Sequence, residues 1–189
     1  MTAMQFLAAA LGSLLVLGTV FGLQDAKPAQ GPVPPPMGHT VVFVRHAEKA
    51  AAGGEDPELS PRGVERAQEI ARLLQHAGVD RIYVSTYRRT QQTMAPLAKS
   101  LGLEPVVVQA ADHDRMLEAL QKADAGSVAV VCTHSNVMPK LAQALGVAPG
   151  RLDAKARIPE DDHTRVYVVD LPAQGVAQAP KLVELALTP

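Results

Sequence analysis

From Thr40 onward, short apolar runs alternate with longer amphipathic stretches along the chain. The first run, "TVVFVRH" from Thr40 to His46, is rich in β-branched residues without polar alternation, which is typical of a strand buried on both faces of a parallel sheet. The next stretch has apolar residues at helical spacing, with Ser60 placed as an N-cap, Pro61 at the first helical position and Gly78 just past the end. This part of the chain therefore predicts a strand followed by a helix.

The same order repeats toward the C-terminus. Further strands are predicted at residues 81–85, 105–109 and 127–134, and further helices at about 90–101, 114–123 and 136–146. Two late apolar runs, 164–171 and 181–187, are expected to pair as a hairpin-like edge. Repeated strand-then-helix order predicts an α/β fold, a three-layer sandwich whose mostly parallel central sheet carries helices on both faces.

The N-terminal residues follow neither pattern. The run from Phe6 to Leu23 has no charged residue, and its length of roughly 18 residues meets the lower limit for crossing a bilayer while resembling a long signal-peptide centre. We therefore assign residues 1–24 to a signal peptide or an N-terminal membrane anchor. Both alternatives stay open, because no Lys or Arg precedes the run and the best cleavage pattern, around Val20-Phe21-Gly22, is not Ala-x-Ala. A buried core helix is disfavoured, since Gly and Ala lie all round the run and leave no polar face.

A proline-rich segment, "DAKPAQGPVPPPMG", follows at residues 25–38. Proline removes amide donors and favours an extended polyproline conformation, so we interpret this segment as a linker. The folded domain is then expected at 39–189, which is long enough for one hydrophobic core. The expected location is outside the cytoplasm, periplasmic or extracellular, with any membrane contact made only through the N-terminal segment.

Composition restricts the classes of partner. The net charge of -1 gives no basic excess, so no nucleic-acid partner is predicted. A single cysteine, Cys132, cannot form an internal disulfide, and its apolar neighbours in "SVAVVCTH" favour a buried side chain over a reactive thiol.

Polar clusters come directly after each of the first four predicted strands. They are the Arg45-His46 pair, "STYRRT" at 85–90, "QAADHD" at 109–114 and "THSN" at 133–136. In open α/β sheets the ligand crevice lies beyond the carboxyl ends of the strands, so these clusters are expected to converge. Guanidinium forks and imidazoles around one point suit a phosphate group. A neutral histidine there can attack phosphorus, and the arginines neutralise the developing charge, so no metal ion and no cofactor are required.

Four blocks of the sequence, in their order along the chain, resemble those of the histidine phosphatase superfamily, which has the phosphoglycerate mutase-like fold. The blocks are "VRHAEKA", "LSPRGVERAQ", "YVSTYRRTQQTMAPLA" and "VVCTHSNVMPKLAQALG". Ala47, where the family often has Gly, makes the first block similar to that of small bacterial members with an "RHAEK" sequence. The resemblance implies that His46 is the nucleophile and that Arg45, Arg89 and His134 hold the phosphoryl group.

The second and third blocks carry two finer implications of this resemblance. Ser60, Pro61 and Gly63 match the helix-start motif of the family, which is structural. The clamp arginine of the family directly precedes a threonine, which favours Arg89 over Arg88.

The general acid is not assigned by the resemblance. Ser135 stands where the phytase-like branch has an aspartate, which excludes that branch, and the region after the third strand has no clear match to the glutamate of the mutases. Asp112 and Asp114 lie in that region and are the candidate acids. The acidic cluster at 160–162 could either cap the site or form a solvated turn, and the turn is favoured. Asn136 is interpreted as an N-cap of the following helix in place of a ligand contact, and Tyr87 as a packing residue.

Three functions of different classes are compatible with these residues. The favoured one is a metal-independent phosphomonoester hydrolase that acts through a phosphohistidine on His46, with a phosphorylated small molecule or a phosphoprotein as substrate. The alternative is an exported or tethered phosphate-binding module that kept the clamp and lost the general acid. A metallohydrolase using His46, His134 and the aspartate pair is the weakest, because the neighbouring arginines would repel a cation.

Overall fold

The computed structural model describes residues 37–187. The predicted signal or anchor segment at 1–24 and nearly all of the proline-rich segment lie outside the described residues. The elements are β1 His39–Arg45, α1 Pro61–Leu74, β2 Arg81–Ser85, α2 Arg88–Leu101, β3 Val106–Val108, α3 His113–Gln121, β4 Val128–Thr133, α4 Met138–Ala144, β5 Arg165–Leu171 and β6 Lys181–Ala186. Their order is the predicted one, with boundaries shifted by a few residues. Within the described part of the chain, no helix is both long and apolar enough to cross a membrane.

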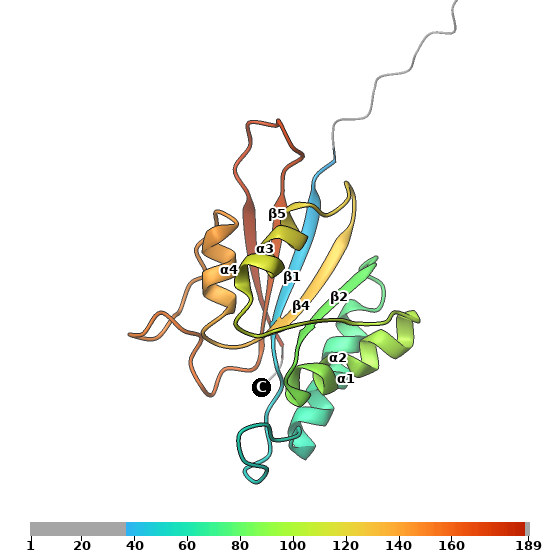
Figure 1. The fold of residues 1–189 in the computed structure, drawn as a ribbon, viewed down its shortest axis with the longest axis vertical. Coiled ribbons are helices and arrows are strands. Elements are labelled where there is room, and N and C mark those ends of the chain that lie inside the picture. Colours follow the sequence, from blue (N-terminus) through green and yellow to red (C-terminus); the bar gives the residue numbers. More distant parts are fainter. Residues whose placement is uncertain (1–36, 188–189) are drawn as a thin grey trace, which may run out of the picture. The chain divides into compact units, whose positions relative to one another are not determined.

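The strands form one six-stranded sheet in the order β3-β2-β4-β1-β5-β6 (Figure 1). The first four strands in the chain pair in parallel, whereas β5 runs antiparallel to both β1 and β6. The predicted mostly parallel sheet and the hairpin at its edge are both confirmed. The parallel part brings the carboxyl ends of β1, β2, β3 and β4 to one edge of the sheet.

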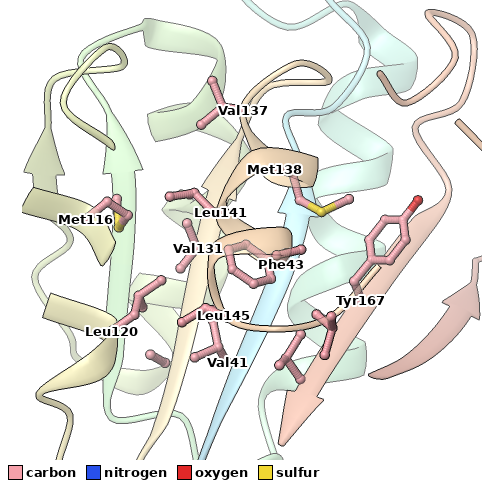
Figure 2. Packing of buried hydrophobic residues seen from close by; sticks show 14 of the residues in the cluster. Val41, Phe43, Met116, Leu120, Val131, Val137, Met138, Leu141, Leu145 and Tyr167 are labelled. Carbon is pink, nitrogen blue, oxygen red and sulfur yellow. The ribbon is translucent and has the colours of Figure 1, made fainter. Parts of the chain in front are cut away.

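Successive strand residues face opposite sides of the sheet, and each side is covered by its own pair of helices. Val41 and Phe43 pack with residues of α3 and α4, including Met116 and Leu141 (Figure 2). The intervening β1 residues, such as Val42, pack with residues of α1 and α2 on the other side. This confirms the predicted three-layer sandwich, and it explains why β1 shows no polar alternation.

The start of α1 has the local structure that the sequence predicts. The Ser60 side chain accepts a hydrogen bond from the Gly63 backbone N at 3.1 Å, and Pro61 takes the first helical position. A Cβ atom on Gly63 would lie 2.1 Å from the carbonyl oxygen of Glu48, so only glycine allows this close approach. The motif is therefore structural, and it fixes α1 against the chain that leaves β1.

Candidate active site

The register of β1 and β4 sets the base of the site. Arg45 pairs with Thr133 across the two parallel strands, and the backbone N–H of His46 continues the ladder by donating to the Thr133 carbonyl at 3.0 Å. The residues after these strand ends, His46 and His134, are therefore neighbours, with ring centroids 5.4 Å apart. Two histidines that are 88 positions apart in sequence thus meet at the same sheet edge.

Both imidazoles border a cavity of about 390 Å³ at the carboxyl ends of the strands. Arg45 and Arg89 also line it, so the structure brings the predicted nucleophile, His46, together with the three residues predicted to hold the phosphoryl group. The remaining lining residues come from the loops around the sheet edge: Lys49, Tyr87, Ala110, Ala111, His113, Ser135, Asn136, Val137 and Glu160. A larger cavity of about 540 Å³ lies elsewhere, among Asp80, Arg81 and Lys122, but no imidazole lines it.

His46 is held in one orientation and kept uncharged. Its Nδ1 lies 2.8 Å from the Ala47 carbonyl oxygen, which can only accept, so Nδ1 carries the proton and Nε2 has the free lone pair. Burial, with help from the charge of nearby Arg45, lowers the pKa of His46 to about 3. The residue is 5 % exposed, and at neutral pH its imidazole is uncharged, which is the form that can act as a nucleophile.

The second histidine, His134, is also buried and neutral. Its Nε2 lies 3.0 Å from the Ser85 hydroxyl, which in turn lies 2.9 Å from the Thr90 hydroxyl. Burial and the charges of Arg89 and Arg45 lower the pKa of His134 to about 4. The end of β2 therefore fixes the orientation of an imidazole supplied by β4.

The Arg45 guanidinium is enclosed by the loop before β5. Its Nη1 donates to the carbonyl oxygens of Pro159 at 2.7 Å, Glu160 at 3.0 Å and Asp162 at 3.2 Å, and its Nη2 lies 3.3 Å from the Glu160 carboxylate. The interpretation of residues 160–162 as a solvated turn is therefore incomplete: Glu160 and Asp161 are exposed, but carbonyl oxygens of the turn also bind a buried guanidinium. A guanidinium that is only 2 % exposed needs acceptors for its N–H groups, and this turn supplies them.

The two arginines at the start of α2 have different environments. Arg89 lines the cavity, its guanidinium lies 4.1 Å from the centroid of the Tyr87 ring, and Nη1 is 3.6 Å from Asp56. The Arg88 side chain is 56 % exposed and pairs with Glu58, away from the cavity. The structure thus brings Arg89, and not Arg88, to the histidines.

One buried hydroxyl, that of Thr93, links the residue after His46 to Arg89. Thr93 Oγ1 accepts a hydrogen bond from the Ala47 backbone N at 2.9 Å and donates to the Arg89 carbonyl at 2.6 Å. The residue after His46 and the first turn of α2 are therefore held by the same side chain.

Arg45 and Arg89, the two arginines that line the cavity, each have one N–H group without a hydrogen-bond acceptor among the described residues. The Nε atoms of Arg45 and Arg89 are buried, and neither finds a hydrogen-bond partner among residues 37–187. Buried polar groups in proteins are normally hydrogen-bonded. Two such donors beside one cavity indicate an anionic ligand.

The candidate acids do not reach the cavity. Asp112 is the N-cap of α3, where its carboxylate accepts from the Arg115 backbone N at 3.1 Å, and Asp114 lies in the first turn of that helix. The residue between them, His113, lines the cavity instead. Among the lining residues, Glu160 is the sole carboxylate.

Two other expectations are also corrected. Asn136 lines the cavity, and the N-cap of α4 is Val137, so the predicted capping role of Asn136 is wrong. Tyr87, interpreted from the sequence as a packing residue, borders the cavity, supports Arg89 and contacts the His134 ring edge-on at 5.2 Å. Its place within "STYRRT" at a strand end was the available signal.

A further histidine, His163, lies beside His46 and was not predicted as part of the site. His163 Nδ1 lies 2.9 Å from the His46 carbonyl oxygen, and the two rings are 5.6 Å apart. No motif in the sequence indicates this contact, because it depends on how the loop before β5 returns to β1.

The arrangement of donor groups does not suit a metal ion. Within the described residues, no group of three or more His, Cys, Asp or Glu side chains is placed to bind one. The aspartate pair that a metallohydrolase would need lies outside the cavity that contains His46 and His134.

Comparisons with known proteins agree with this geometry. Residues 41–112 match the family model of the histidine phosphatase superfamily (branch 1), and no curated protein sequence gives a significant match. The protein histidine phosphatase SixA, solved with tungstate, has a TM-score of 0.60 at 19 % identity and covers 78 % of this chain and 96 % of its own.

Two further solved structures have the same fold. A putative phosphohistidine phosphatase SixA from Agrobacterium tumefaciens has a TM-score of 0.57 at 22 % identity, covering 78 % of this chain and 98 % of that one. A putative alpha-ribazole-5'-P phosphatase from Escherichia coli has a TM-score of 0.62 at 16 % identity, covering 79 % of this chain and 97 % of that one. The segment at 41–112 that matches the histidine phosphatase superfamily model includes Arg45, His46 and Arg89, and the chain has the fold of these three solved structures.

Proposed function

We propose that this protein hydrolyses phosphomonoesters without a metal ion, through a phosphohistidine formed on His46. The observation that carries the proposal is the pairing of a buried, neutral imidazole with two guanidinium groups whose buried Nε–H donors lack partners among the described residues. The first supplies a nucleophile, and the second supplies positive charge for the phosphoryl oxygens. The match of residues 41–112 to the histidine phosphatase superfamily model, and the fold shared with solved phosphatases, support phosphatase activity in general.

The reaction proceeds in two displacements at phosphorus. The Nε2 lone pair of His46 attacks, the P–O bond to the leaving group breaks, and the departing oxygen keeps the bonding electrons and takes up a proton from solvent. Water then attacks the phosphohistidine and releases a proton to solvent, the N–P bond breaks, and inorganic phosphate leaves with the imidazole again neutral. Arg45, Arg89 and His134 surround the phosphoryl oxygens in both steps, where their charge and hydrogen bonds stabilise the transition state.

The substrate is proposed to be a phosphorylated small molecule or a phosphoprotein. Two of the structural neighbours are described as phosphatases of protein histidine or phosphohistidine, and a third as a phosphatase of a small phosphate ester. Both substrate classes therefore belong in a first activity screen.

A phosphate-binding module is the second candidate, and one observation favours it. Asp112 caps α3 and Asp114 does not line the cavity, so neither predicted acid stands beside the leaving group. Such a module would bind phosphate through the same clamp and show no turnover.

Rapid-quench labelling separates the two functions. The full chain is mixed with a radioactive phosphomonoester in the presence of a chelator and then denatured. We expect protein-bound label that is stable in base and labile in acid, and none on the His46→Ala variant. Phosphate binding with neither label nor turnover would favour the binding module, and turnover lost to the chelator would contradict the metal-independent mechanism.

We also propose that residues 1–24 direct export and that residues 25–38 connect this segment to the domain, which would then lie in the periplasm or outside the cell. The apolar run and the proline content of the sequence support this. A reporter that is active only after export, fused after Gly38, is expected to be active. Reporter activity confined to the cytoplasm would contradict it.

A further inference from the structure

We propose that Glu160 is an internal competitor of phosphate: its carboxylate contacts Nη2 of Arg45, is displaced when a phosphoryl group binds, and returns as inorganic phosphate leaves. The inference rests on the proposed function, because it takes Arg45 as part of the phosphoryl clamp. It assigns to Glu160 a role in product release, separate from the chemistry on His46.

The contacts of Glu160 place its carboxylate where a phosphate oxygen would bind. One oxygen lies 3.3 Å from Arg45 Nη2 and the other lies 3.8 Å from Lys49 Nζ. Both cationic residues line the cavity that contains His46. A carboxylate and a phosphoryl group compete for the same face of a guanidinium, because both present oxygen pairs to its N–H fork.

The backbone of the loop holds Arg45 independently of this side chain. Three loop carbonyl oxygens accept from Nη1, whereas the Glu160 carboxylate contacts Nη2. The loop is also closed on itself, because the Asp162 backbone N donates to the Pro159 carbonyl at 3.0 Å and the Asp162 carboxylate binds the Thr164 hydroxyl at 3.0 Å and Arg165. Glu160 can therefore leave Nη2 while the guanidinium stays in place.

Exposure makes the exchange easy. The Glu160 side chain is 67 % exposed, whereas its Arg45 partner is 2 % exposed. An exposed carboxylate regains water when it is displaced, so breaking this pair costs little. The buried guanidinium, in contrast, is left without that partner unless another anion takes the position, and the carboxylate is the nearest replacement as phosphate departs.

A role as proton donor fits the contacts less well. Each oxygen of the Glu160 carboxylate already contacts a cationic group, Arg45 Nη2 or Lys49 Nζ, so neither oxygen is free to face a leaving group. The two roles also differ in their consequences: a competitor weakens the binding of inorganic phosphate, whereas a proton donor accelerates substrates with poor leaving groups.

Calorimetric titration of the full chain with inorganic phosphate tests the proposal without needing turnover. Glu160→Gln keeps the shape of the side chain and removes the competing charge, so the Kd for phosphate is expected to fall about three- to tenfold. The matched control is Asp161→Asn, which removes the same charge from the neighbouring position, outside the cavity lining, and is expected to change Kd less than about twofold. Glu160→Asp, with a shorter carboxylate, should lie close to the wild type or between it and Glu160→Gln.

The outcomes separate this proposal from the proposed function. Unchanged phosphate affinity in Glu160→Gln, or an equal gain in Asp161→Asn, would overturn the competitor role even if wild-type binding depends on Arg89. Phosphate binding that is equal in wild type and Arg89→Ala would instead refute the clamp itself, and the competitor role with it.

A second measurement uses turnover. In Glu160→Gln, inhibition by inorganic phosphate should become stronger by the same factor as the Kd. A variant that instead loses turnover of alkyl phosphates far more than of nitrophenyl phosphate would identify Glu160 as the proton donor and overturn the proposal.

Discussion

The residues at the strand ends and the loop at residues 159–163 build the same cavity in different ways. His46 and His134 directly follow the adjacent parallel strands β1 and β4, in which the preceding residues, Arg45 and Thr133, are paired. Both histidines are almost fully buried. The loop is instead folded round a single guanidinium, that of Arg45, and its Glu160 side chain extends into solvent. The groups proposed to react thus lie at the sheet edge, and the carboxylate proposed to exchange with phosphate lies on the loop.

The strongest test of the strand-end part is His46→Ala. Removing the nucleophile should lower kcat by at least about 10³-fold, while phosphate binding changes much less, because Arg45, Arg89 and His134 remain. Steady-state kinetics and phosphate titration on the same preparation measure the two effects. Turnover within tenfold of the wild type would mean that the attacking group lies elsewhere.

The next largest effect is expected for Arg89→Ala. This change removes a charge-assisted interaction worth about 1.5–3 kcal/mol, so kcat/KM should fall roughly 10- to 150-fold. Arg88→Ala is the matched control, and because its side chain pairs with Glu58 outside the cavity, less than about threefold is expected. The reverse ranking of the two variants would show that the wrong arginine has been assigned to the clamp.

Burial of the two histidines predicts how stability depends on pH. In the folded protein the pKa of His46 is lowered to about 3 and that of His134 to about 4, whereas an unfolded histidine has a pKa of about 6.5. Between these values the unfolded chain binds more protons. The free energy of unfolding should therefore be fully retained above about pH 6.5 and fall as the pH drops toward 4, by up to about 1.4 kcal/mol per pH unit for each group.

Urea unfolding at several pH values checks this dependence. In His46→Gln the slope between about pH 6 and 4 should be shallower than in the wild type, since one titrating group is gone. Parallel slopes would show that His46 titrates alike in both states and is not the buried neutral group described above.

The contribution of the loop to the nucleophile is tested by His163→Phe. This variant loses the donor to the His46 carbonyl, a hydrogen bond worth about 0.5–1.5 kcal/mol, so kcat should fall roughly two- to tenfold. His163→Asn places an amide N–H near the position of Nδ1 and should recover most of that loss. Equal losses in both variants would indicate that the ring packs against His46 and that the hydrogen bond does not matter.

The smallest effect on turnover is expected at Asp112. Asp112→Ala removes the N-cap of α3 and should lower the free energy of unfolding by about 0.5–2 kcal/mol, with kcat unchanged. Asp112→Asn keeps a good cap and should differ little in either quantity. If the asparagine variant loses turnover of alkyl phosphates but not of nitrophenyl phosphate, Asp112 is the proton donor after all.

The sequence predicted most of the fold and part of the site, for a physical reason. Hydrophobic spacing and helix caps are local signals in the sequence. The order of the elements, and the positions of Arg45 and His134 at strand ends, could therefore be predicted from the sequence alone. The turn at 160–162 could not, because its acidic side chains look like a solvated surface until the buried Arg45 guanidinium is placed among its carbonyl oxygens. For Asp112 the sequence suggested a functional role that the structure does not support. Its carboxylate lies in the loop where the acid was expected, but it caps α3.

The hydroxyl of Thr93 has a consequence for how the enzyme would work. It is fully buried and hydrogen-bonded both to the backbone N of the residue after His46 and to the Arg89 carbonyl, so it ties the proposed nucleophile to the first turn of α2. A site built in this way is preorganised: its dipoles already point at the place where charge develops, and little reorganisation energy is needed when the phosphoryl group arrives. The rate of such an enzyme would be set by chemistry or by phosphate departure, with no closing motion of a lid between them.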